Sequence, residues 1–488
     1  MPSRLNEESL SQLDSVALPQ YSRKGLKTGI VHLGTGAFHR GHQAVYTDSL
    51  LATDDNRWGI VGASLRSRSV HDAIAPQDFL YTVSARSAGT KDLRIIGSIQ
   101  DIIVLPEAGQ LQRLAALIAN PDTHAVTLTI TEKGYCHDHM GDLDSKNPSI
   151  IEDLKNPTAP KTAPGVLAYA LKQRMLSEAG GITILSCDNV AGNGSVTRNV
   201  VEAMVSEISP DASDWVANNA SFPTSMVDRI VPQTNTGDID EFTKYAGYED
   251  QGLVICEPYS QWIIEDNFAG ERPNWASVGA QFVTSTQPYE QAKLRLLNAT
   301  HSALAYLGLL SAHEYVHQAM SDHRLASFVR AVMDTEITPA VQCPDGMDLE
   351  QYKDSILDRF KNSDIPYATQ QVASDGSQKL PQRILPTIEH QLRDNGPTSG
   401  LFLVVAAWLH CLLLINDPQA TDIIEFINKS PNKHLDAEQL VRAIAEKSDH
   451  FGNLSHNERF LADLAVTLAM LQQKGSQACV DAYLKARR

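Results

Sequence analysis

The stretch GIVHLGTGAFHRGHQAVYTDSLL, residues 29–51, decides the fold. It begins with a short apolar run rich in β-branched residues, turns through glycines, and continues with the apolar spacing of a helix. At such a junction one glycine permits the tight turn, and another lets the backbone approach a pyrophosphate at the helix N-terminus. Gly34 and Gly36 stand at these positions. The stretch therefore predicts a strand–turn–helix unit that binds a dinucleotide.

The fingerprint of this turn is incomplete. His39 stands where the GxGxxG pattern has its third glycine, so an ordinary strand–helix turn is the alternative. The position of the turn at the first strand of an alternating α/β region favours dinucleotide binding. The residues expected beside the cofactor form the cofactor turn: Gly34, Thr35, Gly36, Ala37 and Phe38.

The end of the second expected strand should select the ribose of the cofactor. An acidic residue there would bind a 2′-hydroxyl group, but GASLRSRS, residues 62–69, contains none. Arg66 and Arg68 could accept a 2′-phosphate, with Ser67 beside them, or the arginines could be solvated loop residues. We expect NAD as the cofactor, with NADP possible.

The texture of the chain changes near residue 285. Before it, apolar runs such as RWGIVGASL, HAVTLTIT, ITILSC and GLVICEP alternate with helical segments, which predicts βαβ units and a mostly parallel sheet. After it, helical periodicity dominates, over 288–311, 323–335, 349–360, 400–415, 419–428, 436–447 and 457–487. The expected architecture is an α/β Rossmann-type dinucleotide-binding domain over 1–285 and an all-helical substrate and catalytic domain over 286–488, with the active site between them.

Composition excludes several classes of protein. The 488 residues have a formal net charge of -17, which argues against nucleic acid or an anionic membrane as the main partner. The six cysteines show no CxxC pair, as expected of reduced thiols, and no secretory signal is visible. The apolar run over 400–415 is shorter than the roughly 20 residues that span a bilayer, so it predicts a buried core helix. We expect a cytoplasmic protein.

The helix expected over 288–311 carries polar residues among its leucines. At roughly 100° per residue, Glu290, Lys293, Asn298 and His301 fall within one arc of about 140° and can face a common cavity. A lysine with a lowered pKa can exchange a proton with a secondary alcohol, and an asparagine amide can donate to an oxygen that gains charge. Taken singly, a solvated lysine and a core histidine are the ordinary interpretations.

Several motifs in order resemble the mannitol dehydrogenase family of long-chain polyol dehydrogenases, which includes fructuronate reductase, also called mannonate oxidoreductase. They are GIVHLGTGAFHRGHQAVY, TLTITEKGY, SCDNVAGNG, MVDRIVP, QWIIEDNFAGERPNWASVGAQFV, KLRLLNATHSALAYLG and DGSQKLPQR, and they extend over about residues 28–386. The resemblance implies a Rossmann-type domain followed by a helical domain, a nicotinamide cofactor, no zinc, and a monomer.

The resemblance also assigns roles by motif. Lys293 is implied as the general acid/base, and Asn189 in CDNV pairs with Asn298 to polarise the substrate oxygen. His301 would orient the substrate, Glu290 would lie in the proton path, and Asp228 in MVDR would bind substrate. NAD-preferring mannitol dehydrogenases carry an acidic pair where this chain has Ser67 and Arg68, which puts strict NAD preference in doubt.

A lysine in TEKGY favours the hexuronate-reducing members of the family over the polyol members. A substrate carboxylate needs a basic partner, and Lys133, Lys379 or Arg383 could supply it. The expected reaction therefore interconverts D-mannonate and D-fructuronate.

Three alternatives remain at this point. The first is a mannitol or arabinitol 2-dehydrogenase, which would take a neutral polyol. The second is a zinc enzyme that uses CHDH, residues 136–139, with His39 and His42, although these residues lack a recognisable zinc spacing. The third is a dinucleotide-binding sensor without catalysis, which the intact set of Lys293, Asn298 and His301 argues against.

Overall fold

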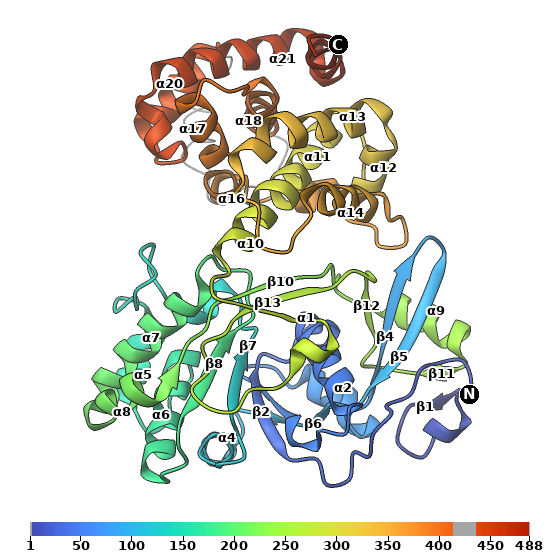
Figure 1. Ribbon diagram of the computed structural model, residues 1–488, viewed down its shortest axis with the longest axis vertical. Coiled ribbons are helices and arrows are strands. Elements are labelled where there is room, and N and C mark those ends of the chain that lie inside the picture. Colours follow the sequence, from blue (N-terminus) through green and yellow to red (C-terminus); the bar gives the residue numbers. More distant parts are fainter. Residues whose placement is uncertain (1, 413–435, 488) are drawn as a thin grey trace. The chain divides into compact units, whose positions relative to one another are not determined.

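The computed structural model describes residues 2–412 and 436–487. The chain divides into two compact units, Met1–Gln287 and Pro288–Arg488. In Figure 1 the first unit runs from blue to yellow-green along the chain and the second from yellow to red. Each unit has its own architecture and is described by itself.

A six-stranded sheet organises the first unit. Its strands are β2 (Thr28–Leu33), β3 (Gly59–Ser64), β6 (Ile99–Val104), β7 (Ala125–Leu128), β8 (Ile182–Ser186) and β9 (Ala220–Ser221). They follow the order β6-β3-β2-β7-β8-β9, and every neighbouring pair is parallel. This is the strand order of a Rossmann fold, in which the chain starts in the middle of the sheet and the order reverses beside the first strand. The α/β fold class expected from the sequence is confirmed.

Helices cover both faces of this sheet, which explains why its strands are apolar runs instead of alternating ones. On one face Ile30 and Trp58 pack with α2 (Gln43–Leu51). On the other face Val31 and Leu33 pack with α4 (Gln110–Ile118), α6 (Ala163–Leu176) and α7 (Asn193–Ile208). The remaining helices of the unit are α1 (Ala37–Gly41), α3 (Ser69–Ile74), α5 (Pro148–Lys155), α8 (Ser213–Asn219) and α9 (Thr236–Ala246).

One apolar run lies outside the main sheet. GLVICEP forms β12 (Val254–Cys256), which pairs with β4 (Tyr81–Ser87), and β4 forms a hairpin with β5 (Thr90–Ile96). A further small sheet contains β10 (Ser225–Asp228), β13 (Gln261–Glu265) and β14 (Gln281–Val283), and β1 (Ser3–Arg4) pairs with β11 (Tyr248–Glu249). An apolar run predicts a buried strand but does not specify its partner, because any sheet covered on both faces accepts it.

The second unit is helical, as expected. Its described helices are α10 (Gln287–Ala292), α11 (Ala299–Leu310), α12 (Val316–Ser321), α13 (His323–Val332), α14 (Leu349–Lys361), α15 (Thr369–Ala373), α16 (Gly376–Arg383), α17 (Leu385–Arg393), α18 (Ser399–Cys411), α20 (Ala437–Lys447) and α21 (Glu458–Lys485). The expected helix over 419–428 and residues 413–415 lie outside the described residues. Helices α12 and α15–α17 were not expected, and Pro381 and Pro386 obscure the periodicity of the last two. No helix within residues 2–412 and 436–487 is long and apolar enough to cross a membrane, and α18 is buried almost throughout.

Within the described part of this unit, two π-helical segments interrupt the helices. The first, η7 (Lys293–Asn298), joins α10 to α11, and the second, η8 (Met333–Ile337), follows α13. The expectation of one regular α-helix over 288–311 was therefore wrong. Apolar periodicity over a whole helix does not reveal a single widened turn, which adds only one residue to the repeat.

A buried carboxylate anchors the second π-helical segment. Glu336 is fully buried, and its Oε1 atom accepts hydrogen bonds from the Gly400 amide at 2.9 Å, the Tyr483 hydroxyl at 2.8 Å and Arg487 at 2.7 Å. Its Oε2 atom accepts from the Leu401 amide at 2.9 Å. The carboxylate thus caps α18 and fixes the C-terminal end of α21, which makes η8 a junction of three elements.

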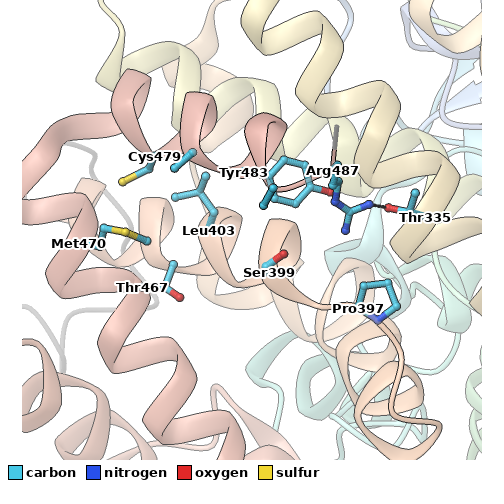
Figure 2. Close-up of a pocket in the computed structure, with 11 residues that line it drawn as sticks. Thr335, Pro397, Ser399, Leu403, Thr467, Met470, Cys479, Tyr483 and Arg487 are labelled. Atoms are coloured by element: carbon cyan, nitrogen blue, oxygen red, sulfur yellow. Dashed lines mark hydrogen bonds between the residues drawn. The ribbon is translucent and has the colours of Figure 1, made fainter.

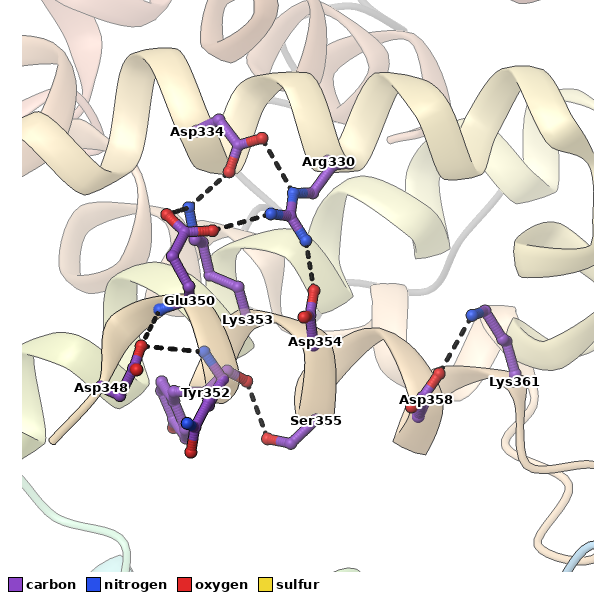
Figure 3. Close-up of polar contacts among 11 residues, drawn as sticks. Arg330, Asp334, Asp348, Glu350, Tyr352, Lys353, Asp354, Ser355, Asp358 and Lys361 are labelled. Atoms are coloured by element: carbon purple, nitrogen blue, oxygen red, sulfur yellow. Dashed lines mark hydrogen bonds and ion pairs between the residues drawn. The ribbon is translucent and has the colours of Figure 1, made fainter.

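Charged side chains hold α13, η8 and α14 together. Arg330 donates to Asp334 at 2.8 Å and to Glu350 at 2.8 Å, and it also pairs with Asp354. Lys353 donates to Glu350 at 2.7 Å and to Asp334 at 2.5 Å (Figure 3). The Lys353 side chain is buried while its two carboxylate partners reach solvent, so the buried charge is paired twice.

The second unit also contains an open pocket of about 650 Å³ (Figure 2). Its apolar wall includes Leu403, Met470 and Ala482. Its polar end is formed by Thr335 and Arg487, which are hydrogen-bonded to each other. The polar end of the pocket is thus engaged in contacts that hold the unit together.

Two buried histidines stack beside the first strand. The rings of His32 in β2 and His39 in α1 have centroids 3.3 Å apart, and both residues are fully buried. The His32 ring contacts the hydroxyl of Thr127 at 2.7 Å and that of Thr129 at 2.9 Å. Burial lowers the pKa of His32 to about 3 and that of His39 well below its usual value, so both rings are neutral at physiological pH.

We expect acid to destabilise the protein through this pair. Below the unfolded-state pKa of roughly 6.5, the two histidines bind protons in the unfolded chain but stay neutral in the folded chain. The contribution of the two neutral histidines to the free energy of unfolding should be fully present above pH 6.5. It should fall as the pH drops toward the His32 pKa of about 3, by up to about 1.4 kcal/mol per pH unit for each histidine. Melting temperatures between pH 7 and pH 4.5 measure this loss.

The His39→Ala variant should be less stable at pH 7 but lose less on acidification. The His139→Ala variant changes an exposed histidine and is the control. Equal slopes for wild type and His39→Ala would contradict the neutral, buried state of the ring.

Candidate active site

Gly34 occupies the tightest point of the cofactor turn. Its φ angle is +97°, and a Cβ atom there would lie 2.0 Å from the carbonyl oxygen of Thr129. The Gly34 carbonyl also accepts a hydrogen bond from the Thr129 hydroxyl at 2.6 Å. These contacts join the ends of β2 and β7, where the strand order reverses, so only glycine suits this position.

Gly36 has open space beside it instead of a close neighbour. Its amide bonds to the Gly34 carbonyl at 2.8 Å, and no atom lies within 4 Å of a Cβ built on Gly36. Gly36 caps α1, whose first residues are Ala37 and Phe38, while Thr35 is buried against the sheet. An exposed backbone at the first turn of a helix fits a pyrophosphate.

The helix after the turn is shorter than expected. The sequence predicts one helix to Leu51, but α1 ends at Gly41, and α2 begins at Gln43 after a break at His42. The His42 ring stacks on Phe38 at a centroid distance of 5.1 Å, and its Nε2 contacts the Gln261 carbonyl at 2.9 Å. The break thus occurs where His42 contacts Gln261, a residue far along the chain. The helical spacing of the sequence gives no sign of that contact.

The two arginines of the loop after β3 differ in their carboxylate partners. Arg68 pairs with Asp72 at 3.1 Å and with Glu107. The Ser67 hydroxyl donates to Ser69 at 2.9 Å. Arg66 is exposed, with no carboxylate partner among the described residues. Arg68 is therefore neutralised locally, and Arg66 remains for a phosphate.

Asp188 fixes the loop that carries Lys133. Its carboxylate accepts hydrogen bonds from the amides of Ile130 and Thr131, both at 2.9 Å, and from the Tyr135 hydroxyl at 2.7 Å. Burial raises the pKa of Asp188, and these three donors oppose that rise. Lys133 itself is exposed after β7. Asp188 is not among the residues predicted from the sequence, although a carboxylate two residues after a buried strand is a visible signal.

Asn193 ties the loop of Asn189 to the strand of Asp228. The side-chain Nδ2 of Asn193 donates to the backbone carbonyls of Asp188 at 2.9 Å and Ser225 at 2.8 Å. Its Oδ1 accepts from the backbone amide of Ser225 at 3.0 Å. Asn189 is exposed in this loop, and Asp228, at the end of β10, is 5% exposed. The bridge fixes the loop that carries one residue beside the strand that carries the other.

The expected residues of the first unit, apart from Asp228 on β10, share one edge of the main sheet. The cofactor turn, Arg66 with Ser67, Lys133 and Asn189 follow the carboxyl ends of β2, β3, β7 and β8, respectively. These strands are neighbours and parallel, so their ends meet at the edge where ligands of open α/β sheets bind.

The expected catalytic residues of the second unit lie in the first π-helical segment or next to it. Lys293 and Asn298 begin and end η7, and they are 8% and 7% exposed. Because a π-helix bonds residue i to residue i+5, Asn298 lies a little more than one turn beyond Lys293, and the two residues lie on nearly the same face. Glu290 precedes the segment in α10, and His301 follows it in α11. On a regular α-helix Lys293 and Asn298 would be about 140° apart.

Asn298 and His301 are held differently. The Nδ2 atom of Asn298 is buried and has no hydrogen-bond partner among the described residues. The His301 ring stacks on Phe360 at a centroid distance of 5.0 Å and meets the edge of Tyr367 at 5.8 Å. A buried, unpaired amide donor is costly unless a ligand completes it, so Asn298 marks a candidate binding position.

Two cations expected to bind substrate lie on α16. Lys379 donates to the carbonyls of Val372 at 3.2 Å and Ser374 at 2.5 Å. Arg383 donates to the Asn298 carbonyl at 3.5 Å and the Ser302 hydroxyl at 3.2 Å. Burial lowers the pKa of Arg383, and it has no carboxylate partner among the described residues. Arg383 is thus a partly buried cation beside Asn298.

The residues considered for zinc have other contacts. His137 bonds to the Asp138 carbonyl, His39 stacks on His32, and His42 contacts Gln261. Within residues 2–412 and 436–487, no three His, Cys, Asp or Glu side chains converge as a metal site. The arrangement does not support the zinc alternative.

Family models match both units. The model described as the mannitol dehydrogenase Rossmann domain matches residues 28–277, and the mannitol dehydrogenase C-terminal domain matches residues 285–472. The chain belongs to the mannitol dehydrogenase family. It is an oxidoreductase of this family, which confirms the prediction from its motifs.

Relatives in the mannitol dehydrogenase family cover nearly the whole chain. D-mannonate oxidoreductase of Escherichia coli K12 is 38% identical over 96% of this chain and 98% of its own. Mannitol 2-dehydrogenase of Phaeosphaeria nodorum is 35% identical over 98% of this chain and 85% of its own. The solved structure of Pseudomonas fluorescens mannitol 2-dehydrogenase, a ternary complex with NAD and D-mannitol, has a TM-score of 0.86, 37% identity and 99% coverage of both chains.

Proposed function

We propose that the protein is an NAD-dependent oxidoreductase that interconverts D-mannonate and D-fructuronate. Arg383 is the reason for proposing a sugar acid as the substrate. Its guanidinium group is partly buried beside Asn298 and has no carboxylate partner among the described residues. A substrate carboxylate would supply the missing anion through a charge-assisted hydrogen bond. The D-mannonate oxidoreductase relative supports the same substrate class.

The π-helical segment supplies the acid/base chemistry in this proposal. In the reducing direction, the Asn298 amide donates to the carbonyl oxygen of the substrate as negative charge develops there. Lys293, on the same face, then gives its proton to that oxygen. Glu290 relays a proton between Lys293 and water, and His301 orients a substrate hydroxyl.

The first unit supplies the remaining groups. Asn189 donates a second hydrogen bond to the reacting oxygen, and Asp228 accepts one from a substrate hydroxyl. Lys133 and Lys379 are further candidates for the carboxylate. Lys379 already contacts two carbonyls and Lys133 is exposed, so Arg383 is the stronger candidate.

The cofactor turn fits NAD. Gly36 leaves room for the pyrophosphate, and Gly34 permits the turn that presents it. NAD(H), when bound, exchanges a hydride with the carbon that carries the reacting oxygen. Arg68 is paired with carboxylates, so a 2′-phosphate would depend on Arg66, with Ser67 next to it. We therefore propose NAD as the main cofactor, with NADP possible.

Mannitol 2-dehydrogenase activity is the second candidate. The Pseudomonas fluorescens relative of the same fold is complexed with NAD and D-mannitol, and its similarity covers 99% of this chain. In this case Arg383 would donate to neutral hydroxyl groups. For either substrate we propose a cytoplasmic protein that is a monomer. Light scattering coupled to size exclusion would test the monomeric state.

Substrate choice can be measured directly. Purified protein with NADH should oxidise the cofactor faster with D-fructuronate than with D-fructose, followed at 340 nm. Arg383→Met should lose the preference for fructuronate, because the cation that receives the carboxylate is removed. Faster turnover of fructose by wild type would favour the mannitol alternative. NADPH in parallel assays measures the role of Arg66.

The Lys293→Ala variant should lose turnover but keep cofactor. Removal of a general acid/base lowers kcat by about 10²–10⁴-fold, while the NADH dissociation constant, measured by fluorescence titration, should be nearly unchanged. Lys361→Ala, which removes an exposed lysine on α14, is the control and should behave as wild type. Near-normal turnover by Lys293→Ala would refute the assignment.

The two glycines of the cofactor turn should respond in opposite ways. Gly36 has a φ of −65°, which alanine also adopts, and there is open space beside it. The melting temperature of Gly36→Ala should therefore equal that of wild type. Its methyl group would occupy the pyrophosphate position, and we expect NADH affinity to fall by about tenfold or more. Gly34→Ala should instead lose stability. Normal NADH binding by Gly36→Ala would exclude this turn as the cofactor site.

A further inference from the structure

Helix α16, which carries Arg383, contacts α11 at both of its ends. At its last residue, the Arg383 guanidinium group donates to the Ser302 hydroxyl at 3.2 Å. At its first residue, Gly376 lies against Tyr306, which stands one turn beyond Ser302 on α11. The helix has only eight residues, about two turns, so a movement of one end is carried to the other. The contacts at Gly376 therefore help to decide where Arg383 lies.

Gly376 has no room for a side chain. A Cβ atom there would lie 2.4 Å from the hydroxyl oxygen of Tyr306 and 2.4 Å from Nε1 of Trp408, a residue of α18. Both of these aromatic side chains are fully buried, so neither can swing out into solvent to make space. The first turn of α16 therefore fits between α11 and α18 only with glycine at this position.

The backbone conformation of Gly376 does not itself require glycine. Its φ angle lies outside the left-handed region, unlike the φ of +55° at Asp375 directly before it. In helices alanine is favoured over glycine by up to about 1 kcal/mol. The lack of space between the two rings is thus the physical reason for glycine at the start of α16.

Ser302 fixes the other end of the contact. It is 1% exposed, and among the described residues it is the one side chain that accepts a hydrogen bond from Arg383. A guanidinium group presents its donors in a single plane, so a bond at one nitrogen helps to set the direction of the others. The remaining donors of Arg383 are those that a substrate carboxylate would use.

We propose that Gly376 and Ser302 are positioning residues for Arg383, and that they thereby determine the preference for a sugar acid. Gly376 sets how closely α16 approaches α11, and Ser302 sets the direction of the guanidinium group. A methyl group at residue 376 pushes the first turn of α16 outward and moves Arg383 with it. The proposal rests on the carboxylate-binding role proposed above for Arg383.

Substrate preference measures this positioning. We expect the ratio of kcat/KM for D-fructuronate to kcat/KM for D-fructose, both with NADH, to fall by about tenfold in Gly376→Ala and in Ser302→Ala. A loss of this size corresponds to one weakened hydrogen bond to a charged group. The change should appear mainly in the KM for fructuronate, while the KM for NADH and kcat with fructose stay near their wild-type values.

Gly400→Ala is the matched control, because it introduces a comparable clash elsewhere in the same unit. A Cβ atom at Gly400 would lie 2.5 Å from Val332 and 2.9 Å from the Glu336 carboxylate. The melting temperature should fall in Gly400→Ala as it does in Gly376→Ala, but the substrate ratio should equal that of wild type. An equal change of the ratio in both variants would show a general effect of instability and overturn the proposal.

A double variant tests the positioning without an activity assay. Ser302→Ala should lower the melting temperature of the wild-type protein, because it removes a buried acceptor of Arg383. In the Gly376→Ala background the same substitution should lower it less, because Arg383 has already moved away from Ser302. Equal lowering in both backgrounds would show that α16 has not moved.

The outcomes separate this proposal from the proposed function. An unchanged substrate ratio in either single variant would overturn the role of that residue. Failure of Gly376→Ala to fold would assign this glycine to stability alone and overturn its positioning role. A wild-type protein that reduces neither fructuronate nor fructose, or that prefers fructose, would overturn the proposed function. The double variant would then still decide whether Gly376 holds α16 against Ser302.

Discussion

The close approach of Gly34 to Thr129 is the constraint on which the first unit depends. It joins the ends of β2 and β7 at the point where the strand order reverses, and a side chain at residue 34 would separate them. Because the sheet is parallel, the strands on both sides of this point end at the same edge. The cofactor turn, the loop of Arg66 and the loop of Asn189 therefore share an edge. Asp188 and Asn193 add the hydrogen bonds that hold the loops after β7 and β8.

The second unit solves a different problem, which is to hold polar side chains on a helix buried among leucines. A regular α-helix would direct Lys293 and Asn298 to different sides, and the π-helical segment brings them together. The surrounding helices are fixed by the buried Glu336 carboxylate and by the ion pairs of Arg330 and Lys353, so the segment has a rigid support.

The sequence predicted the strands of the main sheet because apolar runs bounded by glycine and polar residues are local signals. It also identified the long helices α14, α18 and α21 by their periodicity. It missed α16 and α17, where prolines interrupt the pattern, and it assigned β12 to the main sheet. A partner strand depends on which surface the rest of the chain leaves open, and no local pattern encodes that. The positions of Lys293 and Asn298 in the sequence were visible, but their common face was inferred from the wrong helical geometry.

The sequence by itself determined the fold class, the family and the residue types available for chemistry, because these depend on local spacing and on motifs of adjacent residues. Only the tertiary structure decided which of these residues are engaged elsewhere. Arg68 is neutralised by Asp72 and Glu107, Lys379 contacts two carbonyls, and Arg383 has no carboxylate partner among the described residues. The charge of a side chain is written in the sequence, but its partner is set by residues far along the chain that folding brings within hydrogen-bond distance.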